Sequence, residues 1–175
     1  HNYVTDQLKR EFLVPAIQGD IVTSLAVTEP SGGSDVSALK TTAEKKGDDY
    51  LINGQKMWIT NATQADYFCT LANTSDGNPH TNKSLIIIPS NTKGVSVGDK
   101  IDKLGFRTSD TAPVYFDNVR VPQRFRIGDE GEGFKMQMEQ FQEERLFIAA
   151  SLLVAMDICI DKTIEYCHDR KVFGR

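Results

Sequence analysis

Apolar and polar positions alternate in short runs through most of this chain and give way to a long helical stretch near its C-terminal end. Between residues 21 and 121, runs rich in β-branched and aromatic residues are separated by turn signals such as Gly47-Asp48-Asp49 and Asp76-Gly77-Asn78-Pro79. This pattern is typical of short strands joined by turns. The strands we expect are residues 21–27, 39–46, 50–60, 67–72, 84–88 and 113–116. Their short length and spacing predict an antiparallel β-barrel or sandwich.

Helical patterns flank the β-rich region. Residues 1 to about 20 carry apolar side chains at helical spacing, closed by Pro15, which we interpret as the tail of a longer helix. At the other end, neither glycine nor proline occurs between Gly133 and Gly174, and strong helix formers fill the interval. We therefore expect one long helix, or two nearly collinear helices, from about Phe134 to Arg170.

The middle of this expected helix is apolar on nearly every face. The apolar run covers residues 146–156, is interrupted by Ser151 and is too short to span a bilayer. A helix that is apolar all round has to be buried among other helices. Since no other long helix is expected in the chain, we expect partner subunits and the helical bundle of a larger polypeptide to cover it.

Composition narrows the classes of function. The 175 residues are 39% hydrophobic and 25% charged, as in globular proteins, and the net charge is -4. No basic stripe is present, which argues against a nucleic-acid-binding surface. The three cysteines lack metal-like spacing and the three histidines form no cluster, so we expect no metal site. Because no signal-peptide pattern opens the chain, we expect a soluble intracellular protein.

Two segments carry groups suited to ligand binding. The first runs from Leu25 to Asp35 and joins a strand to a loop in which Gly32 and Gly33 let a ligand approach the backbone closely. Thr28 and Ser34 add hydroxyl groups that can bond carbonyl, ribityl or phosphate oxygens. By itself, a loop of this composition is more often an ordinary surface loop.

The second segment, Asn53 to Asn61, contains the only tryptophan of the chain, Trp58. An indole at a strand end, beside the hydroxyl of Thr60, can cover and hydrogen-bond a flat heteroaromatic ligand. The alternative is a hairpin with Asn53-Gly54 as its turn and Trp58 in the core, which is the commoner position of an isolated tryptophan.

Together, in order and at this spacing, the two segments resemble the acyl-CoA dehydrogenase family. The matching residues are Thr28-Glu29-Pro30 with Gly33-Ser34-Asp35, followed by residues 51–61. Two later stretches extend the resemblance over nearly all of the chain, namely residues 105–122 and the Arg-Lys-x-Phe-Gly element at 170–174. Departures are minor: Ser31-Gly32 stands where a Gly-Ala or Asp-Ala pair is commoner, and Asn61-Ala62 where Asn-Gly is usual.

The resemblance implies a fold of three domains assembled as a homotetramer. Residues 1–20 would be the tail of an N-terminal helical domain, residues 21–128 a middle β-barrel, and residues 129–175 the beginning of a C-terminal helical bundle. The expected class is therefore mainly β with α, a barrel or sandwich followed by a long helix.

The resemblance also implies an FAD site. Trp58 would shield one face of the flavin, Thr60 would bond near flavin N5, and Thr28 would bond the pyrimidine end. Gly33 and Ser34 would meet phosphates of FAD or the pantetheine arm of coenzyme A. Further cofactor contacts are expected at Leu25, Ala26, Val27 and Ile59. Arg170 would reach the FAD of a neighbouring subunit, the alternative being a solvated arginine.

The implied reaction is α,β-dehydrogenation of an acyl-CoA thioester in fatty-acid β-oxidation, with electron-transferring flavoprotein as the electron acceptor. A carboxylate must remove the α-proton. Most of the family carry that glutamate beyond residue 175, but the isovaleryl and long-chain types place it immediately before an arginine on the first bundle helix. Glu144 precedes Arg145 in this way. Arg145 resembles the arginine that holds the substrate region together, and Asn82 aligns loosely with a coenzyme A contact.

Helical spacing favours Glu144 over Glu143 as the base. Glu144 shares a helix face with the apolar Phe141 and Ile148, whereas Glu143 lies about 100° away around the helix. A carboxylate on an apolar face is less stable in its charged form, which makes it a stronger base. The alternatives are that Glu144 pairs with a neighbouring cation, or that the base lies beyond Arg175.

Three other functions stay open from the sequence. A non-catalytic acyl-CoA or fatty-acid-binding homologue would keep the β domain and lack the base, an acyl-CoA oxidase would use oxygen, and a β-rich interaction module would bind no flavin. The acyl chain cannot be named, because the helices that set its length are mostly outside this sequence. The expected compartment is the mitochondrial matrix in a eukaryote and the cytoplasm in a bacterium.

Overall fold

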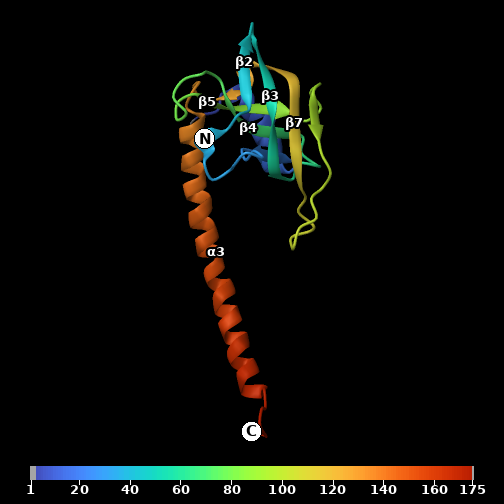
Figure 1. Cartoon of the computed structure of the whole chain (residues 1–175), viewed down its shortest axis with the longest axis vertical. Helices are drawn as coiled ribbons and strands as arrows, with labels where there is room; N and C mark the ends of the chain where they lie inside the picture. Colours follow the sequence, from blue (N-terminus) through green and yellow to red (C-terminus); the bar gives the residue numbers. More distant parts are fainter. Residues whose placement is uncertain (1–2, 175) are drawn as a thin grey trace. The chain divides into compact units, whose positions relative to one another are not determined.

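The computed structural model describes residues 3–174, which divide after Met136 into two compact units. The first unit contains short N-terminal helices, a β-sheet and the first turn of a long helix (Figure 1). The second unit consists of the rest of that helix and a short segment after it.

The N-terminal segment is helical, as its apolar spacing predicts. α1 (Asp6–Leu8), a π-helical stretch (Lys9–Leu13) and α2 (Val14–Gln18) follow one another without a break. The sequence interpretation that Pro15 closes the helix is wrong. Pro15 lies in the first turn of α2, and the helix ends at Gly19, whose φ of +83° is the left-handed conformation typical of a helix C-terminus.

Eight strands of the described residues form one sheet. They are β1 (Thr23–Ala26), β2 (Thr42–Lys46), β3 (Asp49–Thr60), β4 (Tyr67–Asn73), β5 (Lys83–Pro89), β6 (Val95–Val97), β7 (Thr111–Pro122) and β8 (Arg126–Ile127). Their order is β6-β7-β3-β2-β4-β5-β8, with β1 paired to β4. β1 and β2 run parallel to β4, and the other pairings between these strands are antiparallel.

This architecture confirms a mainly β region followed by a long helix. The sheet differs from the expected antiparallel barrel or sandwich because it is mixed and not closed. The parallel pairing arises because the chain leaves β1, forms the β2–β3 hairpin and then returns as β4 in the same direction as β1. β6 and β8 were not predicted, since runs of two or three residues are too short to show a period.

Asn53-Gly54 is not a turn, contrary to the hairpin alternative. The β2–β3 turn is Gly47-Asp48, because Lys46 pairs with Asp49. Asn53-Gly54 lies inside β3, where the register with β7 shifts between Ile52 and Gly54. Glycine is needed there for close approach, since a Cβ at Gly54 would lie 2.5 Å from the Thr41 hydroxyl oxygen.

The core of the first unit lies along β4 and β5, whose residues are buried on both faces. Phe12 of the N-terminal helix packs edge-on against Tyr67 of β4 and against Phe125, with ring centroids 5.2 and 5.1 Å apart. Burial of this apolar surface supplies most of the folding free energy of the unit. The sheet is therefore a rigid base for the loops at its edges.

α3 (Gly133–Asp169) is one helix of 37 residues, which confirms the predicted long helix. Its large apolar side chains between residues 146 and 164 are more than half exposed in the described chain. A contiguous apolar surface of this kind marks a place where other protein packs. The described residues include no helix with the combined length and hydropathy needed to cross a membrane.

Candidate functional site

A bulge in β3 turns Trp58 and Thr60 out of the sheet. β3 takes three residue steps from Lys56 to Ile59 where β7 takes two, so one extra residue is inserted. Lys56 and Ile59 are buried as a result, whereas Trp58 is 57% exposed and Thr60 is also exposed. The alternative placement of Trp58 in the core is therefore wrong, and an indole and a hydroxyl face outward two residues apart.

The backbone of Trp58 is strained. Its φ is +62°, a left-handed conformation that costs a bulky residue about 1–2 kcal/mol. The next turn is held firmly, because buried Asp110 accepts hydrogen bonds from the Thr63 amide and the Gln64 side chain, both at 2.8 Å. Strain of this kind persists where surrounding structure enforces it, and such residues gather at ligand sites.

The first segment folds into a tight turn beside β1. Glu29 and Gly32 exchange two backbone hydrogen bonds of 3.0 Å across Pro30 and Ser31. Gly33 then packs against Thr28 so closely that a Cβ at Gly33 would lie 2.7 Å from Thr28 Cγ2. Only glycine leaves room there, so the Gly33 backbone lies directly against the Thr28 side chain.

Hydrogen bonds join the two segments. The Met57 amide donates to the Thr28 carbonyl at 2.8 Å, and the Lys56 ammonium donates to the Val27 carbonyl at 3.0 Å. Lys56 Nζ also donates to Glu29 Oε1 at 2.9 Å, deep in the protein. The structure thus brings Thr28 and Gly33 of the first segment close to the exposed Trp58 of the second segment.

Glu29 and Lys56 lie within the two motifs but were not predicted from the sequence as members of the site. Burial of the carboxyl alone would raise the pKa of Glu29, but the charge of Lys56 and hydrogen bonds from Thr41, Lys40 and Lys56 hold that pKa below its ordinary value. Burial lowers the pKa of Lys56 to about 8, against the opposing effect of Glu29. The three hydrogen bonds that Lys56 Nζ donates fit an ammonium group paired with the Glu29 carboxylate.

We expect acid to destabilise the first unit through Glu29. Because its pKa is lower in the folded than in the unfolded chain, its contribution is present above the ordinary value of 4.5 and is lost as the pH falls through the lowered pKa. The free energy of unfolding, measured in urea between pH 7 and pH 3, should stay constant down to pH 4.5 and decline below pH 4.5. Glu29→Gln should flatten this decline, and an unchanged slope in that variant would rule out Glu29 as its cause.

The other residues of this unit that were predicted to contact the cofactor differ in how deeply they are buried. Ala26, Val27 and Ile59 are buried, so any contact with a ligand would use their backbone. Leu25 is half-buried and Ser34 is exposed on the loop. These positions fit a ligand lying along the end of β1, with Ser34 at its rim.

Asn82 is turned into the protein. Its side-chain amide donates to the Ser75 carbonyl at 3.3 Å, its side-chain oxygen accepts from Lys83 at 2.9 Å, and its backbone oxygen accepts from the Thr74 amide. The side chain is 9% exposed. Contact with coenzyme A at Asn82 stays a prediction.

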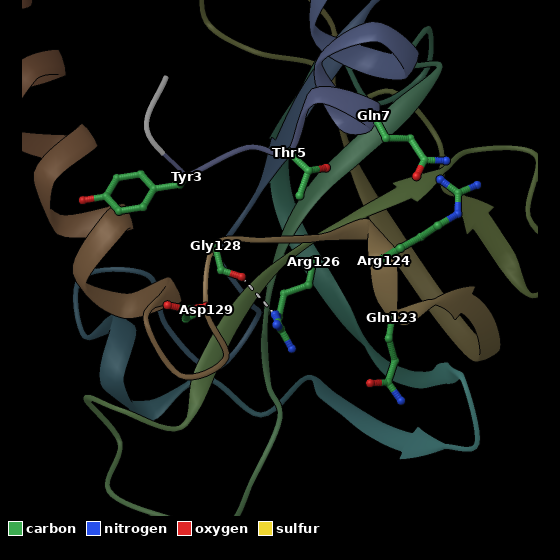
Figure 2. A pocket seen from close by; sticks show the side chains of 8 residues that line it. All are labelled: Tyr3, Thr5, Gln7, Gln123, Arg124, Arg126, Gly128 and Asp129. Carbon is green, nitrogen blue, oxygen red and sulfur yellow. Dashed lines mark hydrogen bonds between the residues drawn. The ribbon is translucent and has the colours of Figure 1, made fainter.

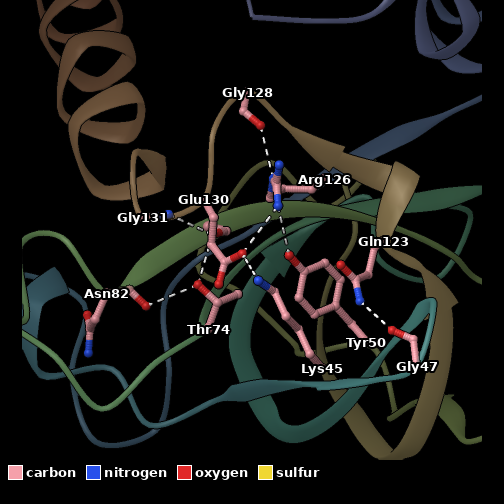
Figure 3. A network of polar contacts seen from close by, with 11 residues as sticks. Lys45, Gly47, Tyr50, Thr74, Asn82, Gln123, Arg126, Gly128, Glu130 and Gly131 are labelled. Carbon is pink, nitrogen blue, oxygen red and sulfur yellow. Dashed lines mark hydrogen bonds and ion pairs between the residues drawn. The ribbon is translucent and has the colours of Figure 1, made fainter.

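A polar network near Asn82 holds the residues that precede α3 (Figure 3). Glu130 pairs with Lys45 of β2 and with Arg126, and Arg126 donates to the Tyr50 hydroxyl at 3.2 Å. Gly131 donates its amide to the Ser84 hydroxyl at 3.1 Å. The network fixes the entry to α3 within the first unit.

A separate cavity of about 480 Å³ contains none of the predicted site residues (Figure 2). Its two arginines already have partners, since Arg124 pairs with Glu11 at 2.7 Å and Arg126 donates to the Gly128 carbonyl at 3.0 Å. The residues lining it are Tyr3, Thr5, Gln7, Gln123, Arg124, Arg126, Gly128 and Asp129. Among the described residues that line it, both arginines are thus already engaged by other groups of the protein.

The second unit carries the other predicted residues on or next to α3. Glu144 accepts a hydrogen bond from Gln140, the residue one turn earlier. The Arg145 guanidinium lies 5.7 Å from the centre of the Phe141 ring. The backbone amide of Arg170 donates to the Tyr166 carbonyl at 2.8 Å just after α3. All three predicted side chains are exposed in the described chain, and their roles stay predictions.

The arrangement in the first unit suits a flat ligand. An exposed indole offers a stacking surface, while the Thr28 and Thr60 hydroxyls and the close Gly33 backbone offer polar contacts at its edges. Among residues 3–174, no three His, Cys, Asp or Glu side chains are grouped to hold a metal ion. The exposed indole and the hydroxyl groups beside it fit an aromatic organic cofactor.

Comparison with protein families matches two regions of the chain. Residues 24–119 match the middle domain of acyl-CoA dehydrogenases and residues 131–175 match their C-terminal domain. The mitochondrial short/branched chain specific acyl-CoA dehydrogenase of Bos taurus is 39% identical over 99% of this chain and 40% of its own length. The chain thus spans about two fifths of the length of that curated relative.

Solved structures agree closely with the fold. A probable acyl-CoA dehydrogenase from Mycobacterium abscessus superposes with a TM-score of 0.91 at 39% identity, over 98% of this chain and 45% of that one. A chain from a structure described as the electron transferring flavoprotein of Acidaminococcus fermentans gives 0.88 at 36% identity, over 99% and 46%. Both likenesses cover the sheet and the long helix together.

Proposed function

Because this chain belongs to the acyl-CoA dehydrogenase family, whose members are FAD-dependent enzymes, we propose that the complete protein oxidises an acyl-CoA thioester to its trans-2-enoyl-CoA. The observation that carries the proposal is the exposed, strained Trp58 held beside Thr28 by a backbone hydrogen bond from Met57. FAD, when bound, supplies an acceptor for the β-hydrogen of the substrate as hydride. The remaining work falls to residues of the protein.

We call the surface formed by Thr28, Gly33, Trp58 and Thr60 the flavin wall. Trp58 would cover one face of the ring system and keep water from it, because an indole offers a large rigid apolar surface. Thr60 and Thr28 would place hydrogen-bond donors at two edges of the ring. Gly33 would let the backbone approach phosphate oxygens, with the exposed Ser34 hydroxyl beside it.

Glu144 is the proposed base for the substrate α-proton. It stands on a regular helix, one turn after Gln140 and next to Arg145. Arg145 would help to hold the substrate region, and Asn82 would contact coenzyme A. Arg170 would extend to the FAD of a neighbouring subunit, where a permanent cation suits a pyrophosphate.

The proposed assembly is a homotetramer that passes electrons to electron-transferring flavoprotein within fatty-acid β-oxidation. Support for an assembly comes from the apolar side chains exposed along α3, which need covering protein. The mitochondrial name of the Bos taurus relative supports a mitochondrial matrix location for a eukaryotic source. A bacterial source would place the protein in the cytoplasm.

The proposal is tested by the absorbance spectrum of the full-length protein. Anaerobic addition of a panel of acyl-CoAs, differing in chain length and branching, should bleach the flavin band with at least one of them and yield the enoyl-CoA. A yellow protein that no acyl-CoA bleaches would be a non-catalytic homologue. Rapid oxygen consumption with the bleaching substrate would instead identify an acyl-CoA oxidase.

We expect Gly33→Ala to weaken FAD binding by roughly tenfold, comparable to the loss of one hydrogen bond. The added Cβ would lie 2.7 Å from Thr28 Cγ2 and 2.8 Å from its hydroxyl oxygen, so Thr28 must move. The measurement is FAD titration of the full-length apoprotein. Gly77→Ala is the matched control, since its Cβ would meet only Ser75 Oγ at 3.5 Å. Equal dissociation constants for the two variants would contradict the role of the Gly33 edge.

A further inference from the structure

Lys56 and Glu29 form a buried ion pair at the base of the flavin wall. Lys56 is fully buried and Glu29 is 5% exposed. All three protons of the Lys56 ammonium are used, because Nζ donates to Glu29 Oε1 at 2.9 Å, to the Val27 carbonyl at 3.0 Å and to the Leu71 carbonyl at 2.8 Å. The lysine therefore connects β3, the loop after β1 and β4 at one point.

The glutamate extends the same connection. Glu29 Oε2 accepts from the Lys40 amide at 2.7 Å, and Oε1 accepts from the Thr41 amide at 2.9 Å. These two amides belong to the segment that leads into β2. The carboxylate thus fixes the loop that carries Thr28 to the strand entering the β2–β3 hairpin.

Stability alone is a weak reason for such a pair. The desolvation cost of two buried charges can equal or exceed their attraction, and apolar residues of similar volume often stabilise a protein as well. The positions of the two residues are more informative. Glu29 follows Thr28 directly, and Lys56 is the last regularly paired residue before the bulge that contains Trp58.

We propose that the Lys56–Glu29 pair is a positioning device that fixes the start of the β3 bulge, so that Trp58 and Thr28 present one surface to the flavin. A one-residue shift of register exchanges the buried and exposed faces of a strand, so the position of the bulge decides which side chains face outward. An ammonium with three defined acceptors pins Lys56 where an apolar side chain would not. This inference rests on the proposed FAD site.

The test uses the full-length FAD-loaded protein and separates positioning from stability. Lys56→Met removes the charge and keeps a linear side chain, and Lys56→Met combined with Glu29→Gln removes the whole pair. Val121→Ala is the control, because Val121 is a buried core residue that pairs with Tyr50 at the opposite end of β3. The readouts are the FAD dissociation constant, the visible circular dichroism of the flavin and its reduction potential, each beside the urea unfolding curve.

If the pair positions the bulge, Lys56→Met and the double variant should each raise the FAD dissociation constant by at least about tenfold. Both should also change the circular dichroism and the reduction potential of the flavin. Val121→Ala should leave the flavin signals unchanged at a comparable loss of stability. The double variant separates the two effects best. It should be more stable than Lys56→Met, while its flavin signals should stay as altered as those of Lys56→Met. The proposal would be overturned if the change in the flavin signals were proportional to the loss of stability in Lys56→Met, the double variant and Val121→Ala alike.

Lys56→Arg covers the case in which Lys56→Met does not fold. Arginine keeps the charge but cannot point its planar head at the same three acceptors, so the variant should fold with altered flavin circular dichroism. Wild-type signals in Lys56→Arg would also overturn the proposal. A wild-type protein that binds FAD but is bleached by no acyl-CoA would contradict the proposed reaction while leaving these readouts intact. Wild-type protein that binds no FAD would contradict both.

Discussion

Glu144→Gln in the full-length protein should slow acyl-CoA-dependent reduction of bound flavin by roughly 10²- to 10⁴-fold, the usual contribution of a general base. Glutamine has nearly the shape of glutamate but cannot accept the α-proton. FAD binding should be unchanged, because the flavin wall lies on other elements of the chain. Stopped-flow absorbance under anaerobic conditions measures the rate, and the flavin spectrum before mixing measures the FAD content.

Glu143→Gln is the matched control for this prediction. It makes the same chemical change one residue earlier, about 100° around the same helix. Its flavin should be reduced at nearly the wild-type rate. Full activity in Glu144→Gln would place the base in polypeptide beyond this sequence, and equal losses in the two variants would indicate a general effect on the helix.

Lys56→Met should lower the free energy of unfolding of the first unit by about 3–5 kcal/mol, the usual cost of removing one partner of a buried pair. The substitution leaves the Glu29 carboxylate buried without its cation and removes a donor from the Val27 and Leu71 carbonyls. Urea unfolding followed by far-ultraviolet circular dichroism measures the change. It is the largest stability effect that we expect from a single side chain at the site.

Combining Lys56→Met with Glu29→Gln should cost less than the sum of the two single changes. Removing both charges leaves no uncompensated ion in the core, and the glutamine oxygen can still accept from the amides of Lys40 and Thr41. Additive losses would mean that the two side chains act independently and that their contact contributes little.

The strands and the long helix could be predicted because their patterns are local. Alternation in residues 50–60 and 67–72 indicated β3 and β4, and the absence of glycine and proline after Gly133 indicated α3. The bulge at Trp58 could not be predicted, because it is defined by the register against β7, more than fifty residues later. For the same reason the alternative in which Asn53-Gly54 forms a turn could not be excluded from the sequence, whereas in the structure the turn is Gly47-Asp48.

The candidate site was predicted in part. The two motifs that resemble the acyl-CoA dehydrogenase family pointed to Thr28, Trp58 and Thr60 as ligand contacts, which stay predictions, and the structure brings the first motif against the second. The ion pair joins residues 27 positions apart, and no local pattern connects them. One signal was present: Lys56 falls at an inward position of an alternating strand, where a lysine needs a buried partner.

The most direct test of whether FAD binds at the flavin wall is a crystal structure of the full-length protein with FAD. We predict that the flavin ring packs against the indole of Trp58, with the Thr28 and Thr60 hydroxyls at its edges and the Lys56–Glu29 pair intact behind them. FAD bound elsewhere, with Trp58 still open to solvent, would rule out the proposed flavin wall.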